Sequence, residues 1–150
     1  MRIFRTKKHT SFDDAEPPFA LLKHDTGAHD PYAHYEMEGR PTSAEFFDQY
    51  AGQTEELRKL YKRGVDQAAD RVLNCVESLE DKGLLDTTLV FVISDHGELL
   101  REQNRGGKFA HSSPMSPELV RVPAVVIGAG LPKGETLDWH LSGIDIAPTL

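Results

Sequence analysis

A long helical pattern between two short apolar runs limits the folds that are open to this chain of 150 residues. From about Thr54 to Lys82, apolar residues recur at helical spacing and charged residues fill the opposite face, with Gly83 as a typical stop. The runs 19–22 and 89–93 on either side predict strands, and a helical crossover makes two strands of one sheet parallel. The pattern therefore predicts an α/β fold with a mostly parallel central sheet and flanking helices. The apolar positions of the helix are Leu57, Leu60, Tyr61, Val65, Ala68, Val72, Cys75, Val76 and Leu79.

Polar residues stand directly after the second predicted strand. The run Leu89-Val90-Phe91-Val92-Ile93 has the apolar, β-branched character of a buried strand, and Asp95-His96-Gly97 follows one residue later. In an open α/β sheet, ligands bind beyond the strand ends, and Gly97 lets the backbone turn sharply there. A carboxylate beside an imidazole suits Zn²⁺ or Mn²⁺ better than an all-oxygen Ca²⁺ cage, and it also suits proton transfer. The alternative is that Asp95 caps a helix and His96 is an ordinary loop residue.

A histidine follows the first predicted strand in the same way. His29 lies in the loop Gly27-Ala28-His29-Asp30-Pro31-Tyr32, which is dense in polar and turn-forming residues. A histidine in this position can donate a proton to a leaving group or hold an anionic oxygen. Because parallel strands present their carboxyl ends at one edge of the sheet, we expect His29 and the Asp95-His96 pair to converge there.

The stretch between the second and third predicted strands holds further candidates. Lys108 and His111 lie in the glycine-rich segment 106–114. His111 could contact the same ligand or be a surface histidine, and Lys108 could attract an anion as a point charge or be a solvated lysine. Glu98 could support the Asp95-His96 pair or simply begin a helix.

Composition excludes several classes of partner. A net charge of −7 with no basic face argues against nucleic acid. No apolar run is long enough to span a membrane, and the residues after Met1 lack an export signal, so we expect a cytoplasmic protein that does not bind membranes. The single Cys75 rules out a disulfide framework and is typical of a small core residue. Residues 1–16 are polar and predict a frayed or partly ordered lead-in, and residues 17–150 predict a partial α/β domain.

Three further elements are predicted from local signals. Pro41-Thr42-Ser43 followed by Glu45 is typical of a helix start. A third apolar strand is expected at 122–127, after an irregular stretch at 97–121. Another element begins at 144–148.

Several of these pieces together resemble one family. They look like the sulfatase branch of the alkaline phosphatase superfamily, and they occur in the family's order over roughly residues 19–150. The motifs are Ala28-His29-Asp30-Pro31-Tyr32, Ser94-Asp95-His96-Gly97-Glu98, His111, Pro117-Glu118-Leu119-Val120-Arg121-Val122-Pro123 and Ile144-Asp145-Ile146-Ala147-Pro148-Thr149-Leu150. The resemblance implies that residues 17–150 form a partial sulfatase-like α/β domain.

The resemblance implies a partial alkaline-phosphatase-like sandwich and a divalent metal ion, whether Ca, Mn, Mg or Zn. Asp95 and His96 match the family's paired metal ligands, although many sulfatases have Asn at the second position. His111 matches a histidine near the metal and the anionic group of the substrate. His29 matches the histidine that contacts that group or its leaving oxygen. Lys108 lies near the place of an anion-binding lysine of the family.

The implied function is metal-dependent hydrolysis of a sulfate ester, with an anionic sulfate or phosphate ester as substrate. The family's nucleophile motif, Cys/Ser-x-Pro-x-Arg, and its early acidic metal ligands are absent from this sequence. We therefore expect a fragment that is inactive alone, and that pairs with a missing amino-terminal half or self-associates. Alternatives are a phosphodiesterase, a phosphatase or a phosphoethanolamine-type transferase of the same superfamily, which His96 keeps open. A non-catalytic remnant or a partner subunit is the alternative outside the enzymes.

Overall fold

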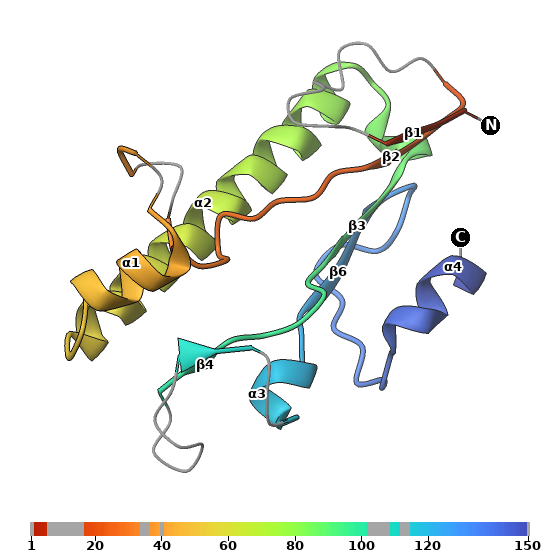
Figure 1. Ribbon diagram of the computed structural model, residues 1–150. Helices are drawn as coiled ribbons and strands as arrows, with labels where there is room; N and C mark the ends of the chain where they lie inside the picture. Colours follow the sequence, from red (N-terminus) through yellow and green to blue (C-terminus); the bar gives the residue numbers. More distant parts are fainter. Residues whose placement is uncertain are drawn as a thin grey trace. The chain divides into compact units, whose positions relative to one another are not determined.

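The computed structural model describes residues 2–5, 17–33, 37–39, 41–101, 109–111 and 115–149. The chain divides into two compact units, Met1–Leu84 and Leu85–Leu150, and each is described by itself. Both units mix helices with short strands (Figure 1), in agreement with the predicted α/β class.

The first unit begins with two parallel strands. Strand β1 (Arg2–Arg5) pairs with β2 (Phe19–Leu22), and Ile3 lies opposite Ala20 in this register. We predicted β2 correctly, but we did not predict a strand within residues 2–5. The segment is basic, yet its central Ile3-Phe4 pair has strand propensity, and β2 supplies the hydrogen-bonding edge that a four-residue strand needs.

Helix α1 (Ser43–Gln49) starts where the sequence predicted. Thr42 and Glu45 form a capping box, in which the Thr42 hydroxyl accepts from the Glu45 N–H and the Thr42 N–H donates to the Glu45 carboxylate. The hydrogen bonds from the Thr42 backbone N–H and hydroxyl lower the pKa of Glu45. The cap fixes the start of a helix that places Phe46 in the core of this unit.

The core of the first unit is aromatic. Tyr32 and Phe46 are both fully buried, and their ring centroids lie 5.6 Å apart in an edge-to-face arrangement. Phe47 and Tyr61 also meet Tyr32 edge-on, at 6.0 and 5.3 Å. Edge-to-face pairs of this kind contribute about 0.5–1.5 kcal/mol each beyond the area that they bury. The cluster joins α1, the long helix and the loop after β2.

Helix α2 (Thr54–Asp81) is the predicted long helix and ends close to its predicted boundary. Gly83 has a φ of +64°, its N–H donates to the Glu80 carbonyl, and the Leu84 N–H donates to the Leu79 carbonyl. This pattern is a Schellman motif, which needs a left-handed residue at Gly83. One predicted core position was wrong: Val65 is 40% exposed, because the apolar stripe is narrower than the spacing suggested.

The segment after β2 lies along α2 in the opposite direction (Figure 1). The Lys23 ammonium donates to the Cys75 thiol at 3.3 Å, and Asp25 binds Arg71. Further along the loop, the carbonyl oxygen of Gly27 lies against Gly64 of α2. A Cβ at Gly64 would overlap this oxygen, so only glycine leaves room for the loop. The loop that carries His29 is thus held against the helix.

The second unit contains two antiparallel strand pairs. After the 3₁₀ turn η3 (Leu85–Thr87), strand β3 (Leu89–Ile93) pairs with β6 (Ala124–Gly128), and β4 (Leu99–Leu100) pairs with β5 (Phe109–Ala110). The strand predicted at 122–127 is β6, which starts two residues later than predicted. The segment 97–121, which we expected to be irregular, contains β4, β5 and a short helix. The mostly parallel sheet that we expected is not what the described strands form.

The reason for the antiparallel pairing is the connection between β3 and β6. A parallel return requires a crossover helix of a dozen or more residues, whereas the helix described in this connection is the four-residue α3 (Pro117–Val120). The strand that we predicted to be buried is also partly open, with Leu89 and Ile93 each 42% exposed.

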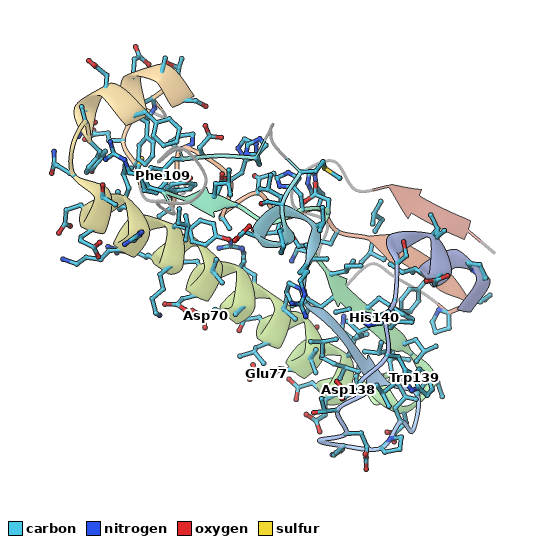
Figure 2. All side chains as sticks on the ribbon, turned by 90° about the horizontal axis from the view of Figure 1, so that it is seen from below. Asp70, Glu77, Phe109, Asp138, Trp139 and His140 are labelled. Carbon is cyan, nitrogen blue, oxygen red and sulfur yellow. The ribbon has the colours of Figure 1, made fainter. Side chains whose placement is uncertain are left out.

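The chain closes the second unit with an extended segment and a short helix. Asp138, Trp139 and His140 lie on the extended segment (Figure 2), and Trp139 is 71% exposed. The turn η5 (Gly143–Asp145) and helix α4 (Ile146–Thr149) follow, and they confirm that an element begins at about residue 144. Within the described residues, no helix combines the length and apolar character that a membrane crossing needs.

Candidate functional site

The Asp95-His96-Gly97 sequence forms a tight corner directly after β3. The Gly97 N–H donates to the Leu119 carbonyl at 2.8 Å, and a Cβ at position 97 would overlap the Glu118 carbonyl oxygen. Ser94 adds a hydrogen bond from its hydroxyl to the His96 carbonyl at 2.6 Å. Backbone contact with α3 therefore sets this corner. Gly97 is needed here for close approach, whereas we expected it to allow a sharp turn.

The two candidate metal ligands face each other across this corner. The Asp95 carboxylate accepts from the His96 N–H at 3.0 Å, and its Oδ1 lies 3.8 Å from Nε2 of the His96 ring. Nδ1 of His96 lies 2.8 Å from the Gly97 carbonyl oxygen, which can only accept, so Nδ1 carries the proton. In the neutral ring, Nε2 then keeps its lone pair, which is the state that a metal ligand needs.

These two residues fit a divalent cation. One ion can bind two donor atoms only when they are closer than twice a metal–ligand bond, or about 4.2 Å for nitrogen and oxygen ligands of zinc. The 3.8 Å between Asp95 Oδ1 and His96 Nε2 satisfies this limit. The Asp95 carboxylate is 75% exposed, so ligands from elsewhere can join it. Zinc takes about four ligands and Mg²⁺ about six, so an ion bound here would need further ligands beyond these two.

His111 lies beside this corner in the same unit. Its ring stacks on the His96 ring, with centroids 4.6 Å apart and planes inclined by 20°. Nδ1 of His111 donates to Oε2 of Glu98 at 3.2 Å, and the Glu98 side chain is only 6% exposed. The structure thus brings together Asp95, His96 and His111. The sequence left two alternatives for Glu98, and the structure places it in contact with His111 and not at the start of a helix.

His29 lies in the first unit, on the loop after β2. The His29 N–H donates to the Thr26 carbonyl at 3.0 Å, and the Ala33 N–H donates to the Gly27 carbonyl at 3.2 Å. Nδ1 of His29 lies 2.8 Å from Oδ1 of Asp30 and 2.7 Å from the Asp30 carbonyl oxygen. The side chain is 47% exposed.

The three histidines share one arrangement. Each places Nδ1 against an oxygen: a backbone carbonyl for His96, the Glu98 carboxylate for His111, and Asp30 for His29. A histidine held in this way presents Nε2 in a fixed direction, for metal binding or for proton transfer. The expected convergence of His29 with the corner involves both units and stays a prediction. Lys108 lies outside the described residues.

Sequence reasoning missed one feature of the His29 loop. Arg71 binds Asp25 through two hydrogen bonds, from Nε to Oδ2 and from Nη2 to Oδ1, the latter at 2.9 Å. Burial alone would raise the pKa of Asp25, but the hydrogen bonds from Arg71 and Gly27 and the charges of Arg71 and Lys23 together lower it. The two residues are 46 positions apart, so no local pattern marks them.

Comparison with known proteins places this chain in a family. The sulfatase family model matches residues 6–150. A low-salt glycan biosynthesis sulfotransferase, Agl7, from Haloferax volcanii is 41% identical over 150 residues, which is 99% of this chain and 36% of that protein. A choline-sulfatase from Rhizobium meliloti is 29% identical over 93 residues, covering 62% of this chain and 17% of that protein. Arylsulfatase K from Gallus gallus is 33% identical over 75 residues, or 50% of this chain and 13% of that protein.

No solved structure matches the chain. The chain spans 36% of the length of Agl7 and smaller shares of the other two relatives. The family match includes the β3 corner, His111, His29 and the α3 segment that pins Gly97. This chain belongs to the sulfatase family of the alkaline phosphatase superfamily.

Proposed function

We propose that this chain carries part of the active site of a metal-dependent enzyme that cleaves sulfate esters. The observation that carries the proposal is the β3 corner, where Asp95 Oδ1 and His96 Nε2 lie within reach of one ion and His111 stacks on the same ring. In this proposal, residues 17–150 are part of an alkaline-phosphatase-like α/β domain. The proposal also places the activity in the full-length gene product, because the chain alone has no Cys/Ser-x-Pro-x-Arg nucleophile segment.

Asp95 and His96 would hold the metal ion. When bound, a divalent ion polarises the ester oxygens and stabilises the negative charge that develops as the S–O bond breaks. His111 presents Nε2 to the anionic sulfate group, while Glu98 holds its Nδ1. Lys108 would add a positive charge for the same anion.

His29 would protonate the leaving oxygen. When both ring nitrogens carry protons, Nδ1 donates to Asp30, and the proton on Nε2 passes to the departing alkoxide as the S–O bond breaks. The sulfuryl group ends on water in hydrolysis, so the products are an alcohol and inorganic sulfate.

The decisive experiment is removal of the two ligands in the full-length gene product. We expect D95A and H96A to lose bound metal, measured by elemental analysis. They should also lower kcat/KM for 4-nitrophenyl sulfate by at least about 100-fold, the upper end of what a supporting partner of a ligand costs. D138A, which alters an exposed acid on the extended segment after β6, is the control. Full metal content and activity in D95A would overturn the proposal.

A second candidate is transfer of the sulfuryl group to a sugar hydroxyl. Its support is the 41% identity to a protein named as a glycan biosynthesis sulfotransferase. The same residues would serve, with a saccharide hydroxyl in place of water as the final acceptor. Mass spectrometry of a reaction with a sulfate ester and an oligosaccharide separates the two, because transfer gives a sulfated sugar and hydrolysis gives free sulfate. Parallel assays with 4-nitrophenyl phosphate and bis(4-nitrophenyl) phosphate test the phosphatase and phosphodiesterase alternatives.

A further inference from the structure

We propose that the Arg71–Asp25 ion pair is a positioning device for His29, which keeps Nε2 of that ring aligned with the leaving oxygen. The proposal rests on the proposed function, because it gives His29 its role as the proton donor. Neither residue contacts the reacting atoms, so both act through the loop that carries His29.

The geometry of the pair is that of a specific clamp. The guanidinium of Arg71 meets both carboxylate oxygens of Asp25 in a two-pronged contact, which fixes direction as well as distance. The side chains are only 31% and 27% exposed. By contrast, the Lys62–Asp66 pair on the same helix joins side chains that are 75% and 60% exposed. Solvent weakens an exposed pair of that kind, but not a half-buried bidentate one to the same extent.

Asp25 connects the clamp directly to the loop. The same Oδ1 that binds Arg71 accepts the Gly27 N–H at 2.8 Å. The Gly27 carbonyl rests against α2 at Gly64 and accepts the Ala33 N–H. His29 lies between Gly27 and Ala33, which these contacts hold, and it follows Asp25 by four residues.

The far end of the loop is anchored by packing instead of charge. Tyr32 is fully buried among aromatic rings, three residues after His29. A loop held at both ends leaves its central side chain little freedom. Release of the Asp25 end would let His29 move while Tyr32 still keeps the loop on the protein. A shift of about 1 Å at a reacting group is enough to lower a rate by about 100-fold.

This role predicts a dependence on the leaving group that a merely structural role would not produce. A poor leaving group needs the proton from His29, whereas 4-nitrophenolate departs without much help. Misplacement of His29 therefore slows esters of poor leaving groups selectively. Loss of folded protein would slow both kinds of ester by the same factor.

The test compares variants of the full-length gene product on phenyl sulfate and 4-nitrophenyl sulfate. We expect H29A to lower kcat for phenyl sulfate by about 100-fold or more and for 4-nitrophenyl sulfate by about threefold. R71M and D25N should reproduce this selectivity at smaller size, about 10- to 100-fold against less than threefold. The double variant with Asp25→Arg and Arg71→Asp should recover part of the phenyl sulfate rate. K62M is the matched control, because it removes an exposed pair from the same helix.

The possible failures are distinct. If H29A is selective and R71M and D25N lower both rates equally or not at all, the clamp has no positioning role. If H29A itself slows both esters equally, His29 is not the proton donor, and the proposed function loses that step. Unchanged metal content in R71M and D25N, measured in the same samples, supports an effect through His29, whereas metal loss would overturn it.

Discussion

The His29 loop and the β3 corner hold their candidate site residues in different ways. The loop depends on side chains from distant parts of the first unit: Arg71 at one end and the aromatic cluster around Tyr32 at the other. The corner depends on backbone, because Gly97 packs directly on the carbonyl groups of α3.

This difference predicts how each region responds to substitution. A loop held by side chains can be loosened by one substitution far away in sequence that leaves the candidate site residues themselves unchanged. A corner held by backbone contact tolerates change in its neighbours' side chains, but not an added atom at the glycine. Substitutions that disturb one region should therefore leave the other intact.

The largest effect on stability should come from the aromatic cluster. Phe46 is fully buried, and F46A should cost about 3–5 kcal/mol through lost burial and a cavity. Hydrogen exchange of the full-length gene product should then show lost protection over 25–33 and retained protection over β3. V65A, at a 40% exposed position of α2, should change little. Equal loss in both regions would contradict the separation.

G97A is the reciprocal test at the corner. The new Cβ would overlap the Glu118 carbonyl and push α3 away, at a cost of about 1–3 kcal/mol. Exchange protection should fall around β3 and α3, and metal content should fall with it. G143A provides the control, because a Cβ at Gly143 meets nothing within 4 Å. A G97A protein with normal metal content would show that backbone contact does not set the corner.

Glu98 sharpens the comparison, since its side chain holds His111 beside the corner. E98A removes the acceptor that holds Nδ1 of His111 and should lower kcat/KM for a sulfate ester by about 10- to 100-fold. E98Q keeps an oxygen acceptor and should cost about tenfold or less. The effect should fall mainly on KM if His111 binds the anion, and E135Q at an exposed position is the control. Full activity in E98A would remove Glu98 from the site.

The smallest effect should be a change in acid stability of the loop. The folded pKa of Asp25 lies below its ordinary value of 3.8, so its stabilising contribution is complete above about pH 4 and is lost as the pH falls through the lowered value. D25N should therefore lower stability near neutral pH and flatten its dependence below about pH 4. Thermal unfolding at pH values from about 3 to 7 measures both. A D25N curve parallel to that of the original protein would contradict this linkage.

Much of the fold follows from local sequence signals. The capping box at Thr42, the stripe of α2 and the glycine stop at Gly83 all act within a few residues, and the structure confirms them. Strand β1 was missed because Ile3-Phe4 is too short to show periodicity and needs β2 as a partner. The antiparallel pairing of β3 with β6 depends on how the chain returns over the 30 residues between Ile93 and Ala124. The local pattern of apolar and polar residues carries no information on that return.

The candidate site divides along the same line. Asp95, His96 and Gly97 are adjacent in sequence, so one strand end was enough to predict their corner. The Glu98–His111 contact and the Arg71–Asp25 pair join residues 13 and 46 positions apart, and neither has a local signal. Side-chain contacts between distant elements are what sequence patterns leave out.

The place of Gly64 on α2 ties the loop to helical register. Gly64 and Arg71 are seven residues apart, or about two turns, so both lie on one face of the helix. Deletion of one residue between them would rotate Arg71 by about 100° away from Asp25, while Gly64 could still receive the Gly27 carbonyl. A variant lacking Ala68 or Ala69 would thus keep the contact of the loop with Gly64 but lose the Arg71–Asp25 ion pair. This part of α2 should therefore tolerate substitutions more readily than a change in its length.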